Sequence, residues 1–269
     1  MNAVGLPQLL DALDVPRGGI LYVQLSTDWV ERAGVAAVDI LPALRDRVGA
    51  AGTLVMPAYP CRTTHLEYLQ SGPVYDPRRT PAGIGLIPEV FRRGEGVKRS
   101  LDPDFCIAAE GPDAEAVVAS DPEEEDPFGR ASVYERLIAL GATHVGLGVS
   151  LNTSSFIHVI DSRLESLYLR PVYAGRFAVD VIDAAGARRT VWRRAVAPPF
   201  QQLTQPSAIA TALADDAATF SSRAVNGARF FRWDLSRWAA WCEAEGRAAL
   251  AEGRWPCWLE RVSQLVEVG

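Results

Sequence analysis

Residues 20–57, ILYVQLSTDWVERAGVAAVDILPALRDRVGAAGTLVMP, contain the pattern that decides the fold. The segments 20–25 and 53–57 are short apolar runs, which are typical of buried strands. Between them, residues 35–48 repeat apolar side chains at helical spacing, and glycines follow that helical stretch. A strand, a helix and a second strand in this order predict a βαβ unit with a buried pair of parallel strands. We therefore expect the α/β fold class.

The rest of the chain adds helices and one hairpin to this unit. Residues 177–182 and 190–195 flank a short turn-forming segment, which predicts a β-hairpin. Further helices are expected over 7–14, 85–93, 112–120, 132–140, 207–224 and 235–251, and a strand over 144–149. The polar, proline-rich stretch 58–82 is long enough to be a functional loop. We expect a single domain over residues 1–269, with a mixed central sheet flanked by helices and the part from about residue 176 packed on the core.

The composition argues against several classes of function. The chain has 269 residues and a net charge of −6, without the basic stripe that nucleic-acid binding requires. No apolar run approaches the roughly 20 residues that span a bilayer, and no signal peptide is evident. We therefore expect no nucleic-acid or membrane partner and a cytoplasmic location. The four cysteines and three histidines show no ligand spacing, so we expect no metal.

The best candidate for catalysis follows the strand at 144–149. His158 and Asp161 are three residues apart, which places both side chains on one face of a helix. A carboxylate beside a histidine raises its basicity and fixes its tautomer, as a general base requires. The alternative is a structural pair. Residues 152–155, NTSS, offer polar groups that either hold a substrate oxygen or cap the helix.

Cys106 is a second candidate. A thiol becomes a strong nucleophile when a nearby base or cation lowers its pKa. Cys106 immediately precedes the apolar residues 107–109, however, and a cysteine in such a setting is usually a small core side chain. Both interpretations stay open at this point.

Several motifs follow the order found in the aminoglycoside 3-N-acetyltransferase family, which the chain resembles from about residue 6 to residue 235. Residues 52–59, GTLVMPAY, are similar to the family's G-T-L-x-M-P segment, and residues 20–26 to its strand ending in His-Ser-Ser. The most specific block is YDPRRTP at 75–81, followed by Gly85 and PEVFRR at 88–93. Later motifs are RS-x-x-P at 99–103, PFG-x-x-S at 127–132, G-x-GV at 146–149, H-x-x-D at 158–161 and VNGA at 225–228.

The resemblance implies an activity. Members of the family transfer an acetyl group from acetyl-CoA to an amino sugar, so it implies an N-acyltransferase that uses an acyl thioester, with His158 as the general base. It further implies that the donor-binding residues are Ser26, Thr27, Tyr59 and Thr80.

The chain also departs from the family's pattern. Gln24 and Asp102 stand where members usually have histidine, Cys106 where serine is common, and Asn152 where aspartate is usual. The residues expected to contact the acceptor are Gln24, Glu89, Asp102 and Asn152. Because the departures lie around the reacting groups, they point to a small amine other than a standard aminoglycoside.

We therefore expect a biosynthetic N-acyltransferase that takes its acyl group from coenzyme A or an acyl carrier protein. In the direct route, His158 accepts the amine proton and Asp161 orients the imidazole ring. One alternative is a ping-pong route through a Cys106-His158-Asp161 triad. Two others are an aminoglycoside resistance acetyltransferase and a non-catalytic binding protein on the same scaffold.

Overall fold

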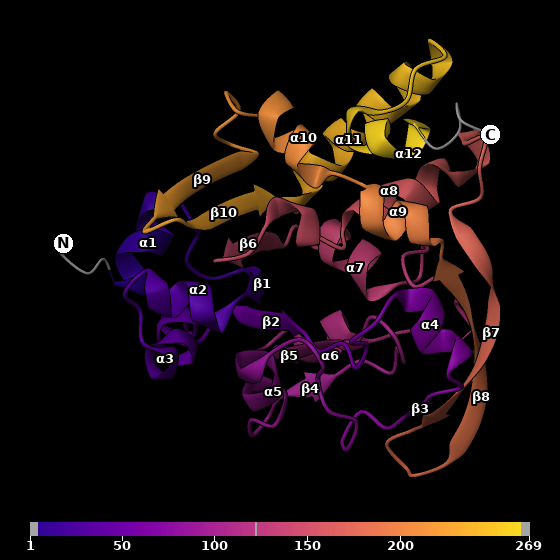
Figure 1. Ribbon diagram of the computed structural model, residues 1–269. Coiled ribbons are helices and arrows are strands. Elements are labelled where there is room, and N and C mark those ends of the chain that lie inside the picture. The colour runs from indigo at the N-terminus through magenta and orange to yellow at the C-terminus, as the bar shows by residue number, and fades with distance from the viewer. Residues whose placement is uncertain (1–4, 122, 265–269) are drawn as a thin grey trace.

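The computed structural model describes residues 5–121 and 123–264, which form ten strands with helices packed around them (Figure 1). The strands are β1 Ile20–Leu25, β2 Thr53–Pro57, β3 Val74–Tyr75, β4 Lys98–Arg99, β5 Ile107–Glu110, β6 Thr143–Leu147, β7 Tyr173–Ile182, β8 Arg188–Val196, β9 Phe220–Val225 and β10 Ala228–Asp234. Seven of them form the main sheet, in the order β4-β5-β2-β1-β6-β10-β9, and β3, β7 and β8 form a second sheet.

The helices contribute the layers on either side of the main sheet. The α-helices are α1 Leu6–Ala12, α2 Thr27–Arg32, α3 Ala37–Val48, α4 His65–Gln70, α5 Leu86–Arg92, α6 Ala114–Val118, α7 Val133–Ala139, α8 Ile157–Leu164, α9 Pro198–Leu203, α10 Pro206–Ala212, α11 Leu235–Ala251 and α12 Glu260–Gln264. Three short 3-10 helices are η1 Leu151–Thr153, η2 Glu165–Leu167 and η3 Cys257–Leu259. The α/β class and the mixed, helix-flanked sheet expected from the sequence are confirmed.

The centre of the main sheet is parallel. Strand β1 pairs in parallel with β2 on one side and with β6 on the other, as the βαβ pattern predicts. All side chains of β2 and all but the last of β1 are buried, because helices cover both faces. Parallel strands end at the same edge of a sheet, so the residues that follow β1, β2 and β6 come together there.

Alternate side chains of β1 feed two separate cores. Leu21 and Val23 pack in the core covered by α1, α3 and α5. Ile20 and Tyr22 pack on the opposite face, in the core that α6, α7, α8 and α11 complete. This alternation is the period-two geometry of a strand buried on both faces. Three of the C-terminal tryptophans, Trp233, Trp238 and Trp258, are fully buried in the second core, so they are packing residues.

The outer strands of the main sheet are antiparallel. Strands β5 and β4 extend it beyond β2, and β10 and β9 extend it beyond β6. The helix expected over residues 207–224 is therefore wrong in its second half, because β9 begins at Phe220. Asn226 and Gly227 join β9 to β10 with positive φ angles of 50° and 81°, the conformation of a tight hairpin turn.

The second sheet curves along one side of the molecule (Figure 1). The hairpin predicted around residues 183–187 is confirmed as β7 and β8, and β3 pairs with β7 in parallel. The stretch 58–82, expected to be a loop, contains both β3 and α4. Thr64 starts α4 with a capping box, in which its side chain accepts from the Glu67 amide while Glu67 accepts from the Thr64 amide.

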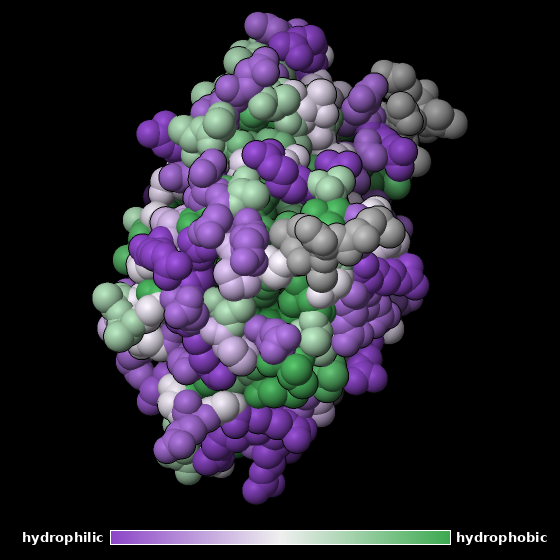
Figure 2. All heavy atoms as spheres, turned by 90° about the vertical axis from the view of Figure 1, so that its left-hand side faces the viewer, coloured by the Kyte–Doolittle hydropathy of each residue, from purple (hydrophilic) through white to green (hydrophobic). Residues whose placement is uncertain are grey.

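The face that carries α1, α2 and α3 is mixed: hydrophilic side chains cover much of it, and hydrophobic ones gather in the lower half of the view (Figure 2). Much of a folded protein's surface is apolar in this way. Among the helices of the described residues, none combines the length and the apolar character that crossing a bilayer requires.

Candidate active site

His158 and Asp161 form a buried pair on α8. The two lie one helical turn apart, with 3.2 Å between His158 Nδ1 and Asp161 Oδ2. Asp161 Oδ1 accepts from the Tyr168 hydroxyl at 3.2 Å and faces the Trp258 indole nitrogen at 3.4 Å. The carboxylate is thus surrounded by donors and fully buried. The same-face geometry expected from the spacing of the two residues is confirmed.

This arrangement fixes the tautomer of the imidazole ring. The Asp161 carboxylate accepts a hydrogen bond from Nδ1, so Nδ1 carries the imidazole proton and Nε2 keeps a free lone pair. Placing the carboxylate behind the ring also stabilises the imidazolium that forms when Nε2 takes a proton. Chemically, such a pair can accept a proton at Nε2.

A cavity of about 220 Å³ lies in front of the pair; we call it the active-site cavity. Its wall comes from the loop after β2, from the turn between β6 and α8, and from α9. The lining residues are Tyr59, Cys61, Thr63, Phe105, Asn152, Thr153, Ser154, Ser155, Ile157, His158, Gln201 and Thr204. The polar cluster 152–155 therefore stands beside His158, as expected of a strand-to-helix turn. Asn152 also holds α10 in place, because its Oδ1 accepts from the Ser207 amide at 2.9 Å.

The active-site cavity is polar but uncharged. Among the described residues that line it, none is Asp, Glu, Lys or Arg. Asp161 stands behind the imidazole and is not part of the wall. The Thr204 hydroxyl oxygen is buried and has no hydrogen-bond partner among the described residues.

A second cavity of about 320 Å³, the side cavity, adjoins the first through Tyr59 and Thr153, which line both. Gln24 lies in its wall, at the end of β1. The Gln24 amide donates to the Thr153 carbonyl at 3.2 Å, and its buried Oε1 has no partner among the described residues. The two cavities meet at the edge where the parallel strands end, which is the usual ligand-binding edge of such sheets.

Three tyrosines form a hydrogen-bonded cluster next to the active-site cavity. The Tyr59 hydroxyl lies 3.1 Å from that of Tyr22 and is also hydrogen-bonded to that of Tyr134. It donates to Ser155 Oγ at 3.1 Å. Burial raises the pKa of all three phenols, so they stay protonated at neutral pH.

Cys106 lies in a different setting from His158. It is fully buried with the core on the α1, α3 and α5 face, and its thiol donates to the Ala58 carbonyl at 2.9 Å. Burial raises the pKa of the Cys106 thiol, and the opposing effect of Arg99 does not offset it. Cys106 is not among the residues that line either cavity. The thiol that does line the active-site cavity belongs to Cys61, which donates to the Thr63 carbonyl at 3.0 Å.

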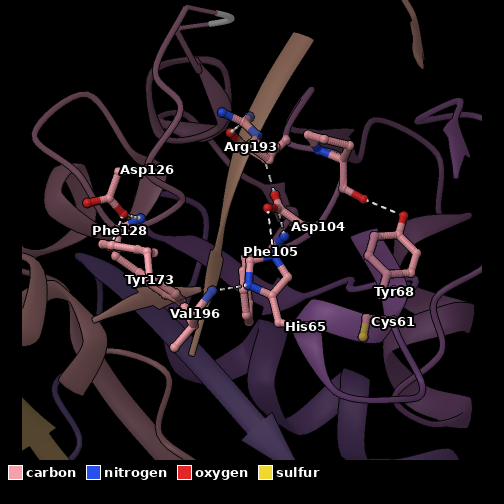
Figure 3. A network of polar contacts seen from close by, with 12 residues as sticks. Cys61, His65, Tyr68, Asp104, Phe105, Asp126, Phe128, Tyr173, Arg193 and Val196 are labelled. Carbon is pink, nitrogen blue, oxygen red and sulfur yellow. Dashed lines mark hydrogen bonds and ion pairs between the residues drawn. The ribbon is translucent and has the colours of Figure 1, made fainter. Parts of the chain in front are cut away.

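Asp102 belongs to a buried ionic network rather than to the cavity wall (Figure 3 shows the neighbouring Asp104). Arg193 on β8 donates to Asp102 Oδ1 at 3.0 Å, and its Nε lies 3.6 Å from Asp104 Oδ1. On the other side, His65 Nε2 donates to Asp104 Oδ2 at 3.0 Å, while His65 Nδ1 accepts from the Val196 amide. The network joins the segment before Cys106 to the second sheet.

Four more residues expected at the site stand apart from both cavities. Ser26 and Thr27 begin α2. The Thr80 hydroxyl accepts from the Asp76 amide at 2.9 Å. Glu89 binds the Ala82 amide and two neighbouring arginines, which lower its pKa to about 2 even though burial opposes this. The side chains of Thr80 and Glu89 thus have local structural roles.

Sequence reasoning missed part of the cavity wall. Cys61 and Thr63 lie in the stretch 58–82, where a functional loop was expected, so that signal was available. Phe105 is adjacent to the candidate Cys106. Gln201 and Thr204 come from α9 and its end, where no sequence motif marks them. Within the described ranges, no three His, Cys, Asp or Glu side chains converge as metal ligands would.

Comparison with known proteins identifies the family. The family model for aminoglycoside 3-N-acetyltransferase matches residues 23–243. The chain is 31% identical to aminoglycoside N(3)-acetyltransferase VIII of Streptomyces fradiae over 69% of its own length and 67% of the relative. It is 34% identical to aminoglycoside N(3)-acetyltransferase IV of a Salmonella species, over 57% of this chain and 56% of the relative.

A solved structure with the same fold is the binary complex of AAC-IIIb with CoASH. It superposes with a TM-score of 0.68 at 23% identity, covering 89% of this chain and 93% of that one. The solved structure thus shares the overall fold of this chain, and the family match extends over most of the sequence. The chain belongs to the aminoglycoside 3-N-acetyltransferase family of acyltransferases.

Proposed function

We propose that this protein transfers an acyl group from acyl-CoA to the amine of a small molecule, by direct attack of the amine on the thioester. The observation that carries the proposal is the His158–Asp161 pair, whose histidine lines the active-site cavity. Family membership and the CoASH complex of AAC-IIIb support coenzyme A as the donor.

The residues divide the chemistry as follows. The amine nitrogen attacks the thioester carbonyl carbon and passes one proton to His158 Nε2. Asp161 stabilises the imidazolium through its contact with Nδ1. The C–S bond then breaks, and the departing thiolate takes the proton from Nε2. An amide and a free thiol result, and His158 returns to its starting state.

The direct test is the release of free thiol from acetyl-CoA in the presence of candidate amines. We expect thiol release that depends on the amine, together with an acceptor whose mass increases by one acetyl group. Acetylated acyl carrier protein, assayed beside acetyl-CoA, tests the carrier-protein donor. Absence of amide product with every amine and both donors would contradict the proposed function and favour a non-catalytic binding protein.

The uncharged wall of the active-site cavity bears on the acceptor. A polycationic amino sugar is best held by carboxylates, since each ammonium group loses hydration on binding. The described lining offers hydroxyl, amide and aromatic groups instead. We infer an acceptor with one amine and few other charges, and hence a biosynthetic rather than a resistance role.

This inference predicts the order of acceptors. We expect monoamines that carry hydroxyl or aromatic groups to have a kcat/KM at least about tenfold above that of a polycationic aminoglycoside, the effect of roughly 1.4 kcal/mol in transition-state binding. Steady-state kinetics on a panel of matched monoamines and aminoglycosides would measure this. A preference for the aminoglycosides would refute the inferred acceptor class.

The setting of Cys106 leads to a second prediction. We expect Cys106→Ser to keep kcat within about twofold, because a buried thiol with a raised pKa is a poor nucleophile. Incubation with acetyl-CoA and no amine should leave the intact mass unchanged. An acetyl adduct that maps to Cys106 and disappears on adding amine would instead establish the ping-pong route. The same mass spectrum reports on Cys61, the thiol in the cavity wall.

A further inference from the structure

The hydrogen bonds of the tyrosine cluster beside the cavity have a defined order of donors and acceptors. Each phenol has a single proton, and Tyr22 and Tyr134 are completely buried. Among the described residues, the hydroxyl of Tyr59 is hydrogen-bonded to both of theirs. Tyr59 can accept two hydrogen bonds and donate one.

In the hydrogen bond between Tyr59 and Ser155, the Tyr59 hydroxyl is the donor and Ser155 Oγ the acceptor. The Tyr59 oxygen can then accept from Tyr22 and from Tyr134, whose side chains also interact with each other. The hydrogen bonds therefore run, from donor to acceptor, from Tyr22 and Tyr134 to Tyr59 and from Tyr59 to Ser155.

This direction leaves the proton of Ser155 unused. Ser155 lines the active-site cavity together with His158, and no described residue accepts a hydrogen bond from its hydroxyl. We propose that Ser155 donates this proton to the carbonyl oxygen of the acyl thioester, and that Tyr22, Tyr59 and Tyr134 orient and polarise it. The inference rests on the proposed acyl transfer and assigns its oxyanion donor.

The role fits the charge that develops in the reaction. When the amine nitrogen bonds to the carbonyl carbon, an electron pair moves onto the carbonyl oxygen, and the Ser155 O–H stabilises that oxyanion. The electron pair on the oxygen re-forms the C=O bond as the C–S bond breaks. Ser155 donates only a hydrogen bond and keeps its proton throughout. Each hydroxyl in this series of hydrogen bonds polarises the next. The Ser155 hydroxyl, which comes after the phenols, is therefore a stronger donor than an isolated hydroxyl.

Ser155 is thus a catalytic residue beside His158, and its loss has a defined kinetic signature. We expect Ser155→Ala to lower kcat by about 10²–10³-fold with KM for both substrates within about threefold, as for loss of an oxyanion donor. Ser155→Thr keeps the hydroxyl and should stay within about tenfold of the wild-type kcat. The pH dependence of kcat/KM should be the same in Ser155→Ala as in the wild type, since His158 is untouched.

The three tyrosines act through Ser155, so their effects should be smaller and graded. We expect Tyr59→Phe to lower kcat by about tenfold and Tyr22→Phe by a few fold, each with KM unchanged. The matched control is Tyr68→Phe, which removes a hydroxyl that donates to the Pro103 carbonyl at 2.7 Å and does not line the cavity. Circular dichroism and thermal unfolding verify that each variant folds.

The outcomes separate the inference from the proposed function. If the wild type forms amide, and Ser155→Ala or Tyr59→Phe folds and keeps the wild-type kcat, the inference is overturned and the acyl transfer stands. A loss of activity in Ser155→Ala that Ser155→Thr does not restore, or that appears in KM instead of kcat, also overturns it. If the wild type forms no amide, the proposed function falls, and the inference with it. The expected order of kcat, wild type above Tyr22→Phe above Tyr59→Phe above Ser155→Ala, supports both.

Discussion

Replacing His158 with alanine should lower kcat by about 10²–10⁴-fold while the fold stays intact, because a positioned general base contributes this much. The imidazole lines the cavity, is hydrogen-bonded to Asp161 and packs against the Phe128 ring, and Asp161 keeps its contacts with Tyr168 and Trp258 when the imidazole is removed. Amine-dependent thiol release measures the loss. Added imidazole, which can enter the space left by the side chain, should restore part of the rate.

Asp161→Asn tests the same pair from its other side. An asparagine at this position can turn either its oxygen or its NH₂ group toward Nδ1. When the NH₂ group donates to Nδ1, the imidazole proton lies on Nε2, and Nε2 then has no lone pair with which to act as a base. We expect a drop in kcat comparable to that of His158→Ala.

The matched control for these variants is His144→Leu. His144 is a buried histidine outside both cavities, and its ring nitrogens have no hydrogen-bond partner among the described residues. Burial lowers the pKa of His144 to about 3, so it is neutral, and a leucine of similar volume should keep kcat within about twofold. A folded His158→Ala with near-normal kcat would exclude His158 as the base.

The elements that sequence analysis predicted best are those with a continuous apolar run or a strong helical period. The predicted bounds of the first two strands coincide with β1 and β2, because both are buried on two faces and bordered by turn residues. The failure at residues 220–224 has a physical cause as well. Strand β9 lies at the edge of the main sheet and only one of its six side chains, that of Phe220, is buried, so its sequence shows no strong alternation. The Asn226-Gly227 pair that follows is a strong hairpin signal, and it outweighs the helical pattern before it.

The candidate site also has one part that the sequence predicts and another that only the folded structure shows. The His158–Asp161 contact follows from spacing within one helix and was predicted. The tyrosine chain joins β1, the segment after β2, α7 and the residues before α8, four places that only the folded chain brings together. The role of Asp102 was unpredictable for the same reason, since its partner Arg193 is 91 residues away in the sequence.

Arg193→Met should be the most destabilising single substitution in the network of Asp102, Asp104, His65 and Arg193. Burial raises the pKa of Asp102, with Arg193 opposing the shift. At Asp104, Arg193 and His65 outweigh burial and lower the pKa of the carboxyl. Without the guanidinium group, two buried carboxylates lose their cation. We expect a loss of about 3–5 kcal/mol in the free energy of unfolding at pH 7, the cost of leaving a buried charge uncompensated.

The pH dependence distinguishes this electrostatic cost from a loss of packing. Asp104 has a lowered pKa in the folded state, so its stabilising contribution is present above the pKa of the unfolded chain, near 3.9, and is lost as the pH falls through the folded value. Removing Arg193 raises the pKa of both carboxyls, and protonation then relieves the unpaired charge. The difference in unfolding free energy between wild type and Arg193→Met should therefore shrink as the pH falls from 7 toward 4. Denaturant unfolding at a series of pH values measures it.

A matched control lies on the same hairpin. Arg176 on β7 also pairs with a carboxylate, Glu125, but about half of its side chain is exposed to solvent. Exposed ion pairs contribute little, so Arg176→Met should lower the free energy of unfolding far less than Arg193→Met does, at any pH. If Arg193→Met costs as little, or if its cost does not change with pH, the network of Asp102, Asp104, His65 and Arg193 does not stabilise the fold through charge. If the cost is as expected, the segment that carries Phe105 into the cavity wall is held by charge, because the Phe105 amide donates to Asp104 Oδ1 at 3.0 Å.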